Sequence, residues 1–352
     1  MEKIISGIQQ MGIGIPNVHE AFDFYRRAFG VDVKVFEEAA EAGLMLPYTG
    51  NQPQSRHAIL AMNLQGGGGF EIWQYVGRTP QPPKFNVKLG DLGIYICKIK
   101  SPDVAKAFKD FKAKGLNVIS DLETAPNGKP HFYMKDPYNN IFEIVEGYGW
   151  FKNENKNTGS VFGAVIGVTD IKKSMVFYKN ILGYDTIVYE NEGTYEDFRS
   201  LPNGDKTFKR VLLRHQKDRV GAFSKLLGPS QIELVQVVND TPNQIFKDRF
   251  WGDLGFIHLC FDAARMNVLQ KDCEAAGHPF TVDSGNSFDM GEAAGHFSYI
   301  EDPDGTLIEF VETHKVPIMK KLGWYLNLKK RNPEKSLPTW MLWAMGMNKV
   351  KD

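Results

Sequence analysis

The strongest constraint on this chain is an internal duplication, in which several blocks recur in the same order in two halves. Residues 13–18 (IGIPNV), followed by Phe24 and Tyr25, return as residues 166–171 (IGVTDI), followed by Phe177 and Tyr178. Residues 70–74 (FEIWQ) return as 232–236 (IELVQ), and GDLG occurs at 90–93 and 252–255. An Asp-Pro turn at residues 136–137 returns at 302–303, with a glutamate at the same place after each turn, Glu143 and Glu309. Ordered matches of this kind indicate duplicated structural units.

Each half divides again into two similar segments. A short apolar run leads into a helical pattern that stops at a glycine, four times over, at Gly30, Gly115, Gly183 and Gly277. Glycine after a helix suits a left-handed C-cap. Short β-rich runs bounded by Gly, Pro, Asn and Asp follow each helix and predict strands joined by turns. The pattern predicts an α+β fold of four βαβββ modules.

These modules predict two tandem domains. We expect an N-terminal domain over residues 1–151, with modules at 8–78 and 90–148, and a polar linker over 152–159. A C-terminal domain is expected over 160–313, with modules at 160–238 and 252–313. Residues 314–352 form a basic, aromatic extension outside the repeat, for which an arm packed across the domains is preferred to a membrane-binding or partner-binding segment.

Composition restricts partners and location. The chain has 42 basic and 42 acidic side chains, so no bulk field favours nucleic acid or an anionic membrane. No signal peptide pattern and no apolar run long enough to span a bilayer are present, which favours a cytoplasmic protein. Its three cysteines lack CxxC spacing, and Cys97 and Cys260 lie in apolar runs typical of buried strands.

The sequence resembles the vicinal oxygen chelate superfamily, which includes glyoxalase I, bleomycin-resistance proteins and extradiol dioxygenases. The resemblance is carried by the block at residues 13–30, the strand GFIHLCF at 255–261 and the segment DPDGTLIEFVE at 302–312. It covers roughly residues 8 to 313 and implies that modules pair, each pair closing around one divalent metal ion. Such an ion needs open positions for two vicinal substrate oxygens, so the protein supplies only a few N and O ligands.

In this superfamily the first strand of a module offers one ligand and its last strand a carboxylate. Carried over by position, the first module supplies Gln10 and Glu71, and the fourth supplies His258 and Glu309. The other two offer Ile96 with Glu143, and Gly163 with Glu233. Neither Ile96 nor Gly163 can coordinate a metal through its side chain.

The pairing of the modules therefore decides how many sites survive. Pairing within each half leaves two sites short of a ligand, whereas pairing across the halves concentrates both losses in one site. We favour the cross-paired arrangement, which predicts one metal site of Gln10, Glu71, His258 and Glu309. In that arrangement Glu143 and Glu233 are relics that pair with a basic side chain. The ion is one of Zn, Ni, Co, Mn or Fe.

Each predicted ligand has a plainer structural interpretation. His258 lies in an apolar strand, where a lone histidine is more often a core residue. Glu71 and Glu309 have apolar neighbours, and a buried carboxylate is costly unless paired or bound to metal. His296 and Tyr299 are candidates for a proton shuttle or a substrate contact. Spacing gives no functional role to the remaining histidines, which are His19, His57, His131, His215, His278 and His314.

The resemblance implies a metal-dependent lyase or isomerase of the glyoxalase kind, a monomer or homodimer that acts on a small bidentate oxygen substrate. The ion would polarise a carbonyl and Glu309 or Glu71 would move the proton. Strict glutathione dependence is not expected, because residues 12–14 and 73–75 lack the family's arginine and asparagine. The alternatives are an extradiol-type Fe(II) dioxygenase and a metal-free protein that sequesters a ligand.

Overall fold

The strand-helix-strands order predicted from the sequence occurs four times in the computed structural model, which describes residues 2–285, 288–290, 293–319 and 324–350. The first module consists of β1 (Ile4–Gly14), α1 (Val18–Phe29), β2 (Val33–Glu41), β3 (Ser55–Met62) and β4 (Gly69–Tyr75). The second consists of β5 (Gly93–Ser101), α2 (Val104–Ala113), the short β6 (Asn117–Val118) and β7 (Glu123–Thr124), β8 (Pro130–Lys135) and β9 (Ile141–Glu146).

The second half repeats this order. The third module consists of β10 (Val161–Gly167), α3 (Ile171–Leu182), β11 (Thr186–Gly193), β12 (Phe208–Arg214), the short α4 (Ser224–Leu227) and β13 (Gln231–Val237). The fourth consists of β14 (Gly255–Ala264), α5 (Met266–Ala275), β15 (Val282–Asp283), β16 (Phe288–Met290), β17 (Ala293–Glu301) and β18 (Leu307–Thr313). Short 3-10 turns lie at Leu46–Tyr48, Glu196–Phe198, Leu328–Lys330 and Met345–Asn348.

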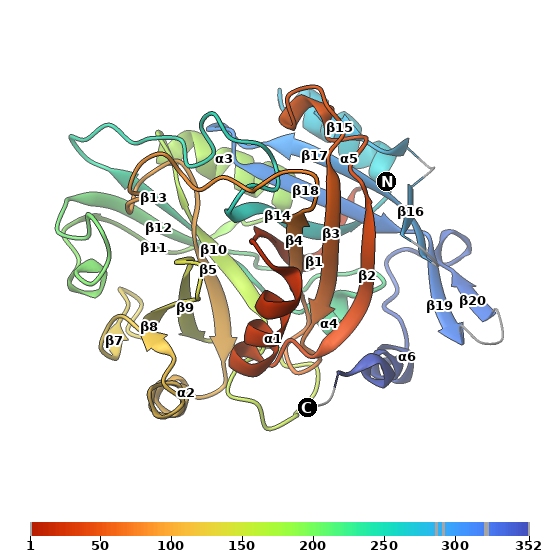
Figure 1. Cartoon of the computed structure of the whole chain (residues 1–352), viewed down its shortest axis with the longest axis horizontal. Helices are drawn as coiled ribbons and strands as arrows, with labels where there is room; N and C mark the ends of the chain where they lie inside the picture. The colour runs from red at the N-terminus through yellow and green to blue at the C-terminus, as the bar shows by residue number, and fades with distance from the viewer. Residues whose placement is uncertain (1, 286–287, 291–292, 320–323, 351–352) are drawn as a thin grey trace.

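The modules pair across the two halves of the chain. Strand β1 runs antiparallel to β14, so the first and fourth modules share one nine-stranded sheet, here sheet A. Eight of its strands follow the order β15-β17-β18-β14-β1-β4-β3-β2, and the ninth, β16, pairs with β17. Strand β10 pairs with β5, and the second and third modules share sheet B in the order β11-β12-β13-β10-β5-β9-β8-β6. Figure 1 shows the two sheets side by side, each containing early and late segments. The predicted cross-pairing is confirmed.

Some repeated residues join one element to the next. The Gln74 side chain at the end of β4 accepts a hydrogen bond from the Val18 amide at the start of α1 (2.8 Å), and Gln236 does the same for Ile171 (3.2 Å). Each glutamine therefore satisfies an amide of the first turn, which has no partner within the helix.

Other repeated residues join neighbouring modules. The hydroxyl of Tyr25 donates to Asp136 (2.6 Å), and that of Tyr178 donates to Asp302 (3.0 Å). Each aspartate begins an Asp-Pro turn and each tyrosine belongs to the Phe-Tyr pair of the preceding module. These contacts give the two repeated motifs a structural role.

The four predicted glycines all have a left-handed backbone, with φ between 63° and 81°. Gly30 and Gly183 are the C-caps of α1 and α3, as expected. The C-caps of α2 and α5 are instead Lys114 and Ala276, and the glycine follows one residue later. All four helices are therefore followed by a left-handed glycine, which is the C-cap itself in α1 and α3 and the next residue in α2 and α5.

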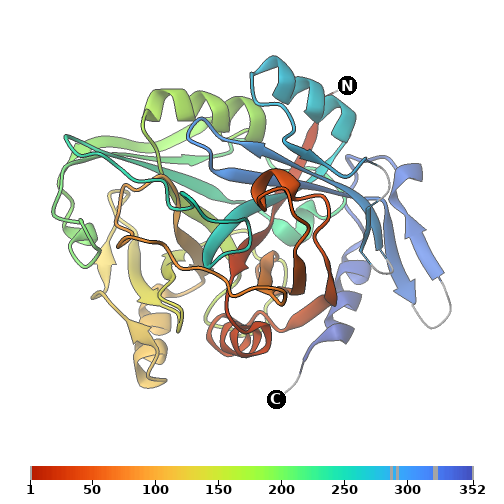
Figure 2. The same cartoon turned by 45° about the horizontal axis from the view of Figure 1, so that its top comes forward.

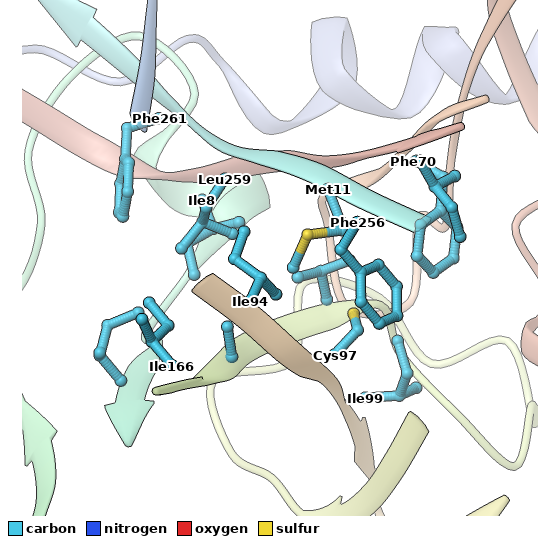
Figure 3. Close-up of a cluster of buried hydrophobic side chains, with 14 of the residues drawn as sticks. Ile8, Met11, Phe70, Ile94, Cys97, Ile99, Ile166, Phe256, Leu259 and Phe261 are labelled. Carbon is cyan, nitrogen blue, oxygen red and sulfur yellow. The ribbon is translucent and has the colours of Figure 1, made fainter. Parts of the chain in front are cut away.

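The main apolar core lies between the two sheets and under the helices. Figure 3 shows Met11, Phe256 and Leu259 of sheet A facing Ile94 and Cys97 of sheet B. Both predicted core cysteines are fully buried. In Figure 2 α3 and α5 lie together along one side of the molecule, away from this contact.

The C-terminal extension forms the hairpin β19 (Lys315–Met319) and β20 (Trp324–Asn327), followed by helix α6 (Thr339–Ala344). Leu337 and Leu342 are buried against Val33, Leu64 and Leu226, which agrees with a packed arm. Two tryptophans of α6 differ from that expectation, because Trp340 and Trp343 are 58% and 50% exposed. Among the described residues, no helix combines the length and the hydropathy needed to cross a bilayer.

Candidate metal centre

The four predicted ligands lie on four adjacent strands at the middle of sheet A. His258 on β14 and Gln10 on β1 occupy the central pair, while Glu309 on β18 and Glu71 on β4 flank it. Side chains two apart on a strand share a face. The three ionisable ligands therefore share a face with Trp73, Cys260 and Val311, which belong to an apolar cluster on the side away from the helices, here the inner face.

The donor atoms of three of these residues converge. His258 Nε2 lies 3.0 Å from Glu309 Oε2 and 3.4 Å from Glu71 Oε2. One donor atom from each residue falls within 4.8 Å of the other two. Ligands bound tetrahedrally at about 2.1 Å from zinc are separated by about 3.4 Å, so little movement would be needed to surround an ion.

Gln10 reaches the same cluster with its amide group. Its Nε2 lies 3.5 Å from Glu309 Oε2, and its buried Oε1 has no hydrogen-bond partner among the described residues. The two ends of an amide differ by a half-turn about the last side-chain bond. With that turn Oε1 would face the carboxylates, where an oxygen is useful only if a cation lies between them.

Burial sets the electrostatics of the cluster. His258 is fully buried, while the side chains of Glu309 and Glu71 are 8% and 15% exposed. Burial alone would lower the pKa of His258, but the carboxylates of Glu309 and Glu71 outweigh it and raise that pKa to about 9. A proton on the imidazole therefore offsets part of the carboxylate charge, and a dication could take its place.

Aromatic side chains enclose the imidazole. The Trp251 ring lies parallel to that of His258, with centroids 6.1 Å apart and an interplanar angle of 6°. The hydroxyl of Tyr299 lies 3.4 Å from His258 Nδ1. Burial and the nearby Glu309 charge raise the pKa of Tyr299 well above its usual range, so the phenol stays protonated. Tyr299 can therefore hydrogen-bond the nitrogen that faces away from the carboxylates.

His296, the other proposed proton shuttle, is placed differently. It lies three residues before Tyr299 on β17 and so projects from the opposite face of the strand. Its Nε2 lies 2.5 Å from Asp283 Oδ1. The structure therefore brings Tyr299, and not His296, to the cluster.

A glycine makes room for the histidine. Gly12 on β1 is the cross-strand partner of His258, and a Cβ at Gly12 would overlap the imidazole ring. Gly12 is not among the site residues predicted from the sequence. Its position two residues after Gln10, on the same strand face, is the signal that could have suggested it.

The corresponding position in sheet B holds a buried ionic network in place of a metal cluster. Glu143 and Glu233 lie there as predicted, and the Lys98 ammonium contacts both, at 2.6 Å from Glu233 Oε2 and closer still to Glu143. Arg210 forms ion pairs with Glu233 and, at 2.7 Å, with Asp197. His131 Nδ1 lies 2.8 Å from Glu143 Oε1. The predicted pairing with basic side chains is confirmed.

The charges in this network balance. Burial alone would lower the pKa of His131, but Asp197 and Glu143 raise it to about 9, so it is cationic at neutral pH. Despite its burial, the pKa of Glu143 is held far below its usual range by Lys98 and His131. Three cations therefore face three carboxylates. Lys98 lies between two glutamates, where an ion would lie in a metal-binding pair of modules. It is not among the site residues predicted from the sequence.

A cleft of about 410 Å³ opens on the far side of Trp251, and none of the four predicted ligands is among the residues that line it. Its walls come from the loops at residues 47–50, 244–251 and 301–307 and from the start of β5 and β14. Trp251 and Ile257 line this cleft and also belong to the apolar cluster of the inner face. Trp251 thus contacts both the cleft and the imidazole of His258.

Comparison with known proteins identifies the architecture. The family model of the Glyoxalase/Bleomycin resistance protein/Dioxygenase superfamily matches residues 7–144 and 161–310. Glyoxalase I from Zea mays superposes with a TM-score of 0.51 at 12% identity, covering 87% of this chain and 92% of the maize chain. A proposed dioxygenase from Bacillus subtilis superposes with a TM-score of 0.56 at 15% identity, covering 88% and 86%. No curated protein sequence matches significantly.

Proposed function

Because this chain belongs to the Glyoxalase/Bleomycin resistance protein/Dioxygenase superfamily, we propose that it is a divalent-metal-dependent enzyme of the glyoxalase kind. Its reaction would be a lyase or isomerase step on a small substrate with two vicinal oxygens. The observation that carries this proposal is the convergence of Glu71, His258 and Glu309 within 4.8 Å on the inner face of sheet A.

The donor set fits a divalent ion. Two carboxylates neutralise its charge, and the imidazole nitrogen and amide oxygen are neutral donors suited to Zn, Ni, Co, Mn or Fe. The unpartnered Oε1 of Gln10 supports this fit. Four ligands from rigid neighbouring strands leave positions for a substrate in an ion of higher coordination number. When bound, the ion would supply Lewis-acid polarisation of a substrate carbonyl.

Three residues of the cluster would transfer the proton, orient the imidazole and hold charge. Glu71 is the more exposed carboxylate and is therefore the better placed to accept a proton from a substrate carbon and return it. Tyr299 would hold the imidazole orientation through Nδ1, because a second partner fixes the ring and its tautomer. Glu309, closest to His258, would mainly hold charge.

The cleft lined by Trp251 is the proposed route for the substrate. Its volume of about 410 Å³ suits a small molecule, and aromatic side chains form part of its walls. Arg249 on its wall donates to the backbone oxygens of Ile245 and Leu254. The Arg249 guanidinium therefore stabilises the loop that contains it through these hydrogen bonds. Gln74, which follows the second ligand, is used as the cap of α1. These assignments support a substrate other than glutathione conjugates.

Elemental analysis of protein purified without chelator, and again after divalent-ion soaking, tests the proposal. We expect the wild type to hold about one more ion per chain than His258→Ala or Glu309→Gln. Glu41→Gln, an exposed carboxylate at the end of β2, serves as the control and should match the wild type. Thermal unfolding of each variant would show whether it remains folded.

Equal metal content in the wild type and the two ligand variants would overturn the proposal. Activity distinguishes the chemistry, because an isomerase or lyase consumes no oxygen. Oxygen uptake with a catechol and Fe(II) would replace it with dioxygenase chemistry. Ligand binding unaffected by His258→Ala and by chelation would instead identify a metal-free binding protein.

A further inference from the structure

A second group of metal-ligating side chains lies outside the cluster, on the surface of the first module. It consists of His19 in the first turn of α1, Glu37 on β2 and His57 on β3. Spacing along the chain gives neither histidine a role, because the three residues are far apart in the sequence. Only the packing of α1 against this end of the sheet brings them together.

The donor atoms have the spacing of a metal site. Glu37 Oε1 lies 3.2 Å from His57 Nε2 and 3.6 Å from His19 Nε2, and all three donor atoms fall within 4.8 Å of one another. The two imidazole rings meet edge to face, with centroids 5.2 Å apart. Tetrahedral ligands of zinc are about 3.4 Å apart, so the separations of Glu37 Oε1 from the two imidazole nitrogens are those of ligands around one ion.

Local structure positions the backbone of each ligand residue. The pairing register places Glu37 opposite Ile59 and His57 opposite Ala39, so Glu37 and His57 are diagonal neighbours on one face of the β2–β3 pair. Asn17, the N-cap of α1, accepts a hydrogen bond from the His19 amide at 3.1 Å and fixes the first helical turn. The Glu37 and His57 side chains are about three-quarters buried, whereas the His19 side chain is 64% exposed and is the ligand that a bound ion would order most.

The chemistry of the group selects the ion. Two imidazoles and one carboxylate suit zinc, nickel or copper rather than magnesium or calcium, which prefer oxygen ligands. A hydrogen bond from Lys34 to Glu37 Oε2 (2.6 Å) lowers the pKa of Glu37, so this carboxylate is ionised over a wide pH range. Lys34 uses the other carboxylate oxygen, which leaves Oε1 facing the histidines. Its charge opposes a bound cation, but its side chain is 36% exposed and can turn away.

We propose that His19, Glu37 and His57 form a second, surface metal site that binds zinc or a similar borderline cation, with water at the fourth position. The bound ion would join the start of α1 to β2 and β3 at the edge of sheet A. An ion that binds the folded chain but not the unfolded chain stabilises the folded state, so this ion would also stabilise the edge of sheet A. The site shares no residue with the cluster of Glu71, His258 and Glu309.

Zinc titration of the full chain tests the site by equilibrium dialysis. The wild type should bind about one more zinc per chain than His19→Ala or His57→Ala, and Glu37→Gln should bind that zinc at least about tenfold more weakly. Glu38→Gln is the matched control, because it removes the same charge from the neighbouring residue, which pairs with Arg56. It should bind zinc as the wild type does. Zinc should raise the thermal midpoint of Glu309→Gln but not that of the double variant Glu309→Gln/His57→Ala, in which both groups of ligands are disrupted.

The outcomes separate this site from the proposed function. Zinc lost only in the His258 and Glu309 variants would overturn the surface site and leave the proposed function intact. Zinc lost only in the His19, Glu37 and His57 variants would support the surface site and remove the metal from the proposed function. Binding by the His19 and His57 variants equal to that of the wild type would overturn the surface site.

Discussion

At the scale of single residues, the candidate site depends on a glycine, Gly12, at the position across from His258. His258 can turn its Nε2 toward two carboxylates because its cross-strand partner, Gly12, has no Cβ. In a packed interior even one added methyl group requires neighbours to move. The imidazole is the nearest neighbour, so the geometry of the cluster is sensitive to residue 12.

We expect Gly12→Ala to displace the His258 ring. Metal affinity should fall by roughly tenfold or more, and the free energy of unfolding should fall by about 1–3 kcal/mol, as for other overpacked sites. Metal content after dialysis and urea unfolding would measure the two effects. Gly43→Ala is the control, because a Cβ at Gly43 meets nothing within 4 Å. Unchanged metal affinity in Gly12→Ala would contradict the close contact.

At the scale of elements, β5 and β14 occupy equivalent places in the two sheets but carry different chemistry. Strand β14 presents His258, whereas β5 has Ile96 at the equivalent position and Lys98 two residues later on the same face. The ammonium of Lys98 satisfies the two glutamates that the repeat retains, Glu143 and Glu233. Buried carboxylates need a partner, and a lysine on the adjacent strand provides one.

Lys98→Met should strongly destabilise the chain. Removing one partner of a buried ion pair leaves uncompensated charge and costs about 3–5 kcal/mol. Urea unfolding would measure the loss. Lys106→Met on α2 removes an exposed lysine that pairs with Asp110, and it should change stability by less than about 1 kcal/mol. A small effect of Lys98→Met would show that the glutamates find another partner.

The same network predicts a pH dependence. The folded-state pKa of His131, about 9, is above its ordinary value of 6.5, so protonation stabilises the fold. That contribution is fully present below about pH 6.5 and disappears as the pH rises through about 9. We expect the stability advantage of the wild type over His131→Gln to shrink by up to about 3 kcal/mol across this window.

Urea unfolding of both proteins at several pH values between 6 and 9.5 would measure that difference. Other titrating groups are common to both proteins and largely cancel. Parallel stability curves over this range would mean that His131 is not protonated in the folded chain.

At the scale of the whole molecule, the two halves of the chain are interleaved. Each sheet takes one module from each half, and the central contacts β1 to β14 and β5 to β10 both join residues from different halves. The apolar core between the sheets also combines both halves (Figure 3). Neither half therefore contains a complete sheet of its own.

Splitting the chain between Asn155 and Lys156 tests this interdependence. When the two fragments are produced together they should copurify at high salt, because their contact is strand pairing and apolar burial. Each fragment produced alone should be poorly folded, with low thermal cooperativity. Two independently folded fragments that do not associate would contradict the interleaved arrangement.

Much of this arrangement could be predicted from the sequence. The repeated blocks predict four βαβββ modules, and the structure and the family match confirm the fold. The glutamines, tyrosines and aspartates that recur are those that cap helices or join modules, which explains why the duplication is visible at all. The convergence of Gln10, Glu71, His258 and Glu309 was predicted only through the assumption that modules pair across the halves.

The sequence by itself determined the modules and the position of each candidate ligand along its strand, because hydrophobic periodicity and turn residues act locally. The tertiary structure decided which modules share a sheet. It also decided that Lys98 and Arg210 pair with the glutamates of sheet B, and that Tyr299 rather than His296 reaches the cluster in sheet A. It also brought His19, Glu37 and His57 together. These features depend on contacts between residues far apart in the chain, which local patterns do not encode.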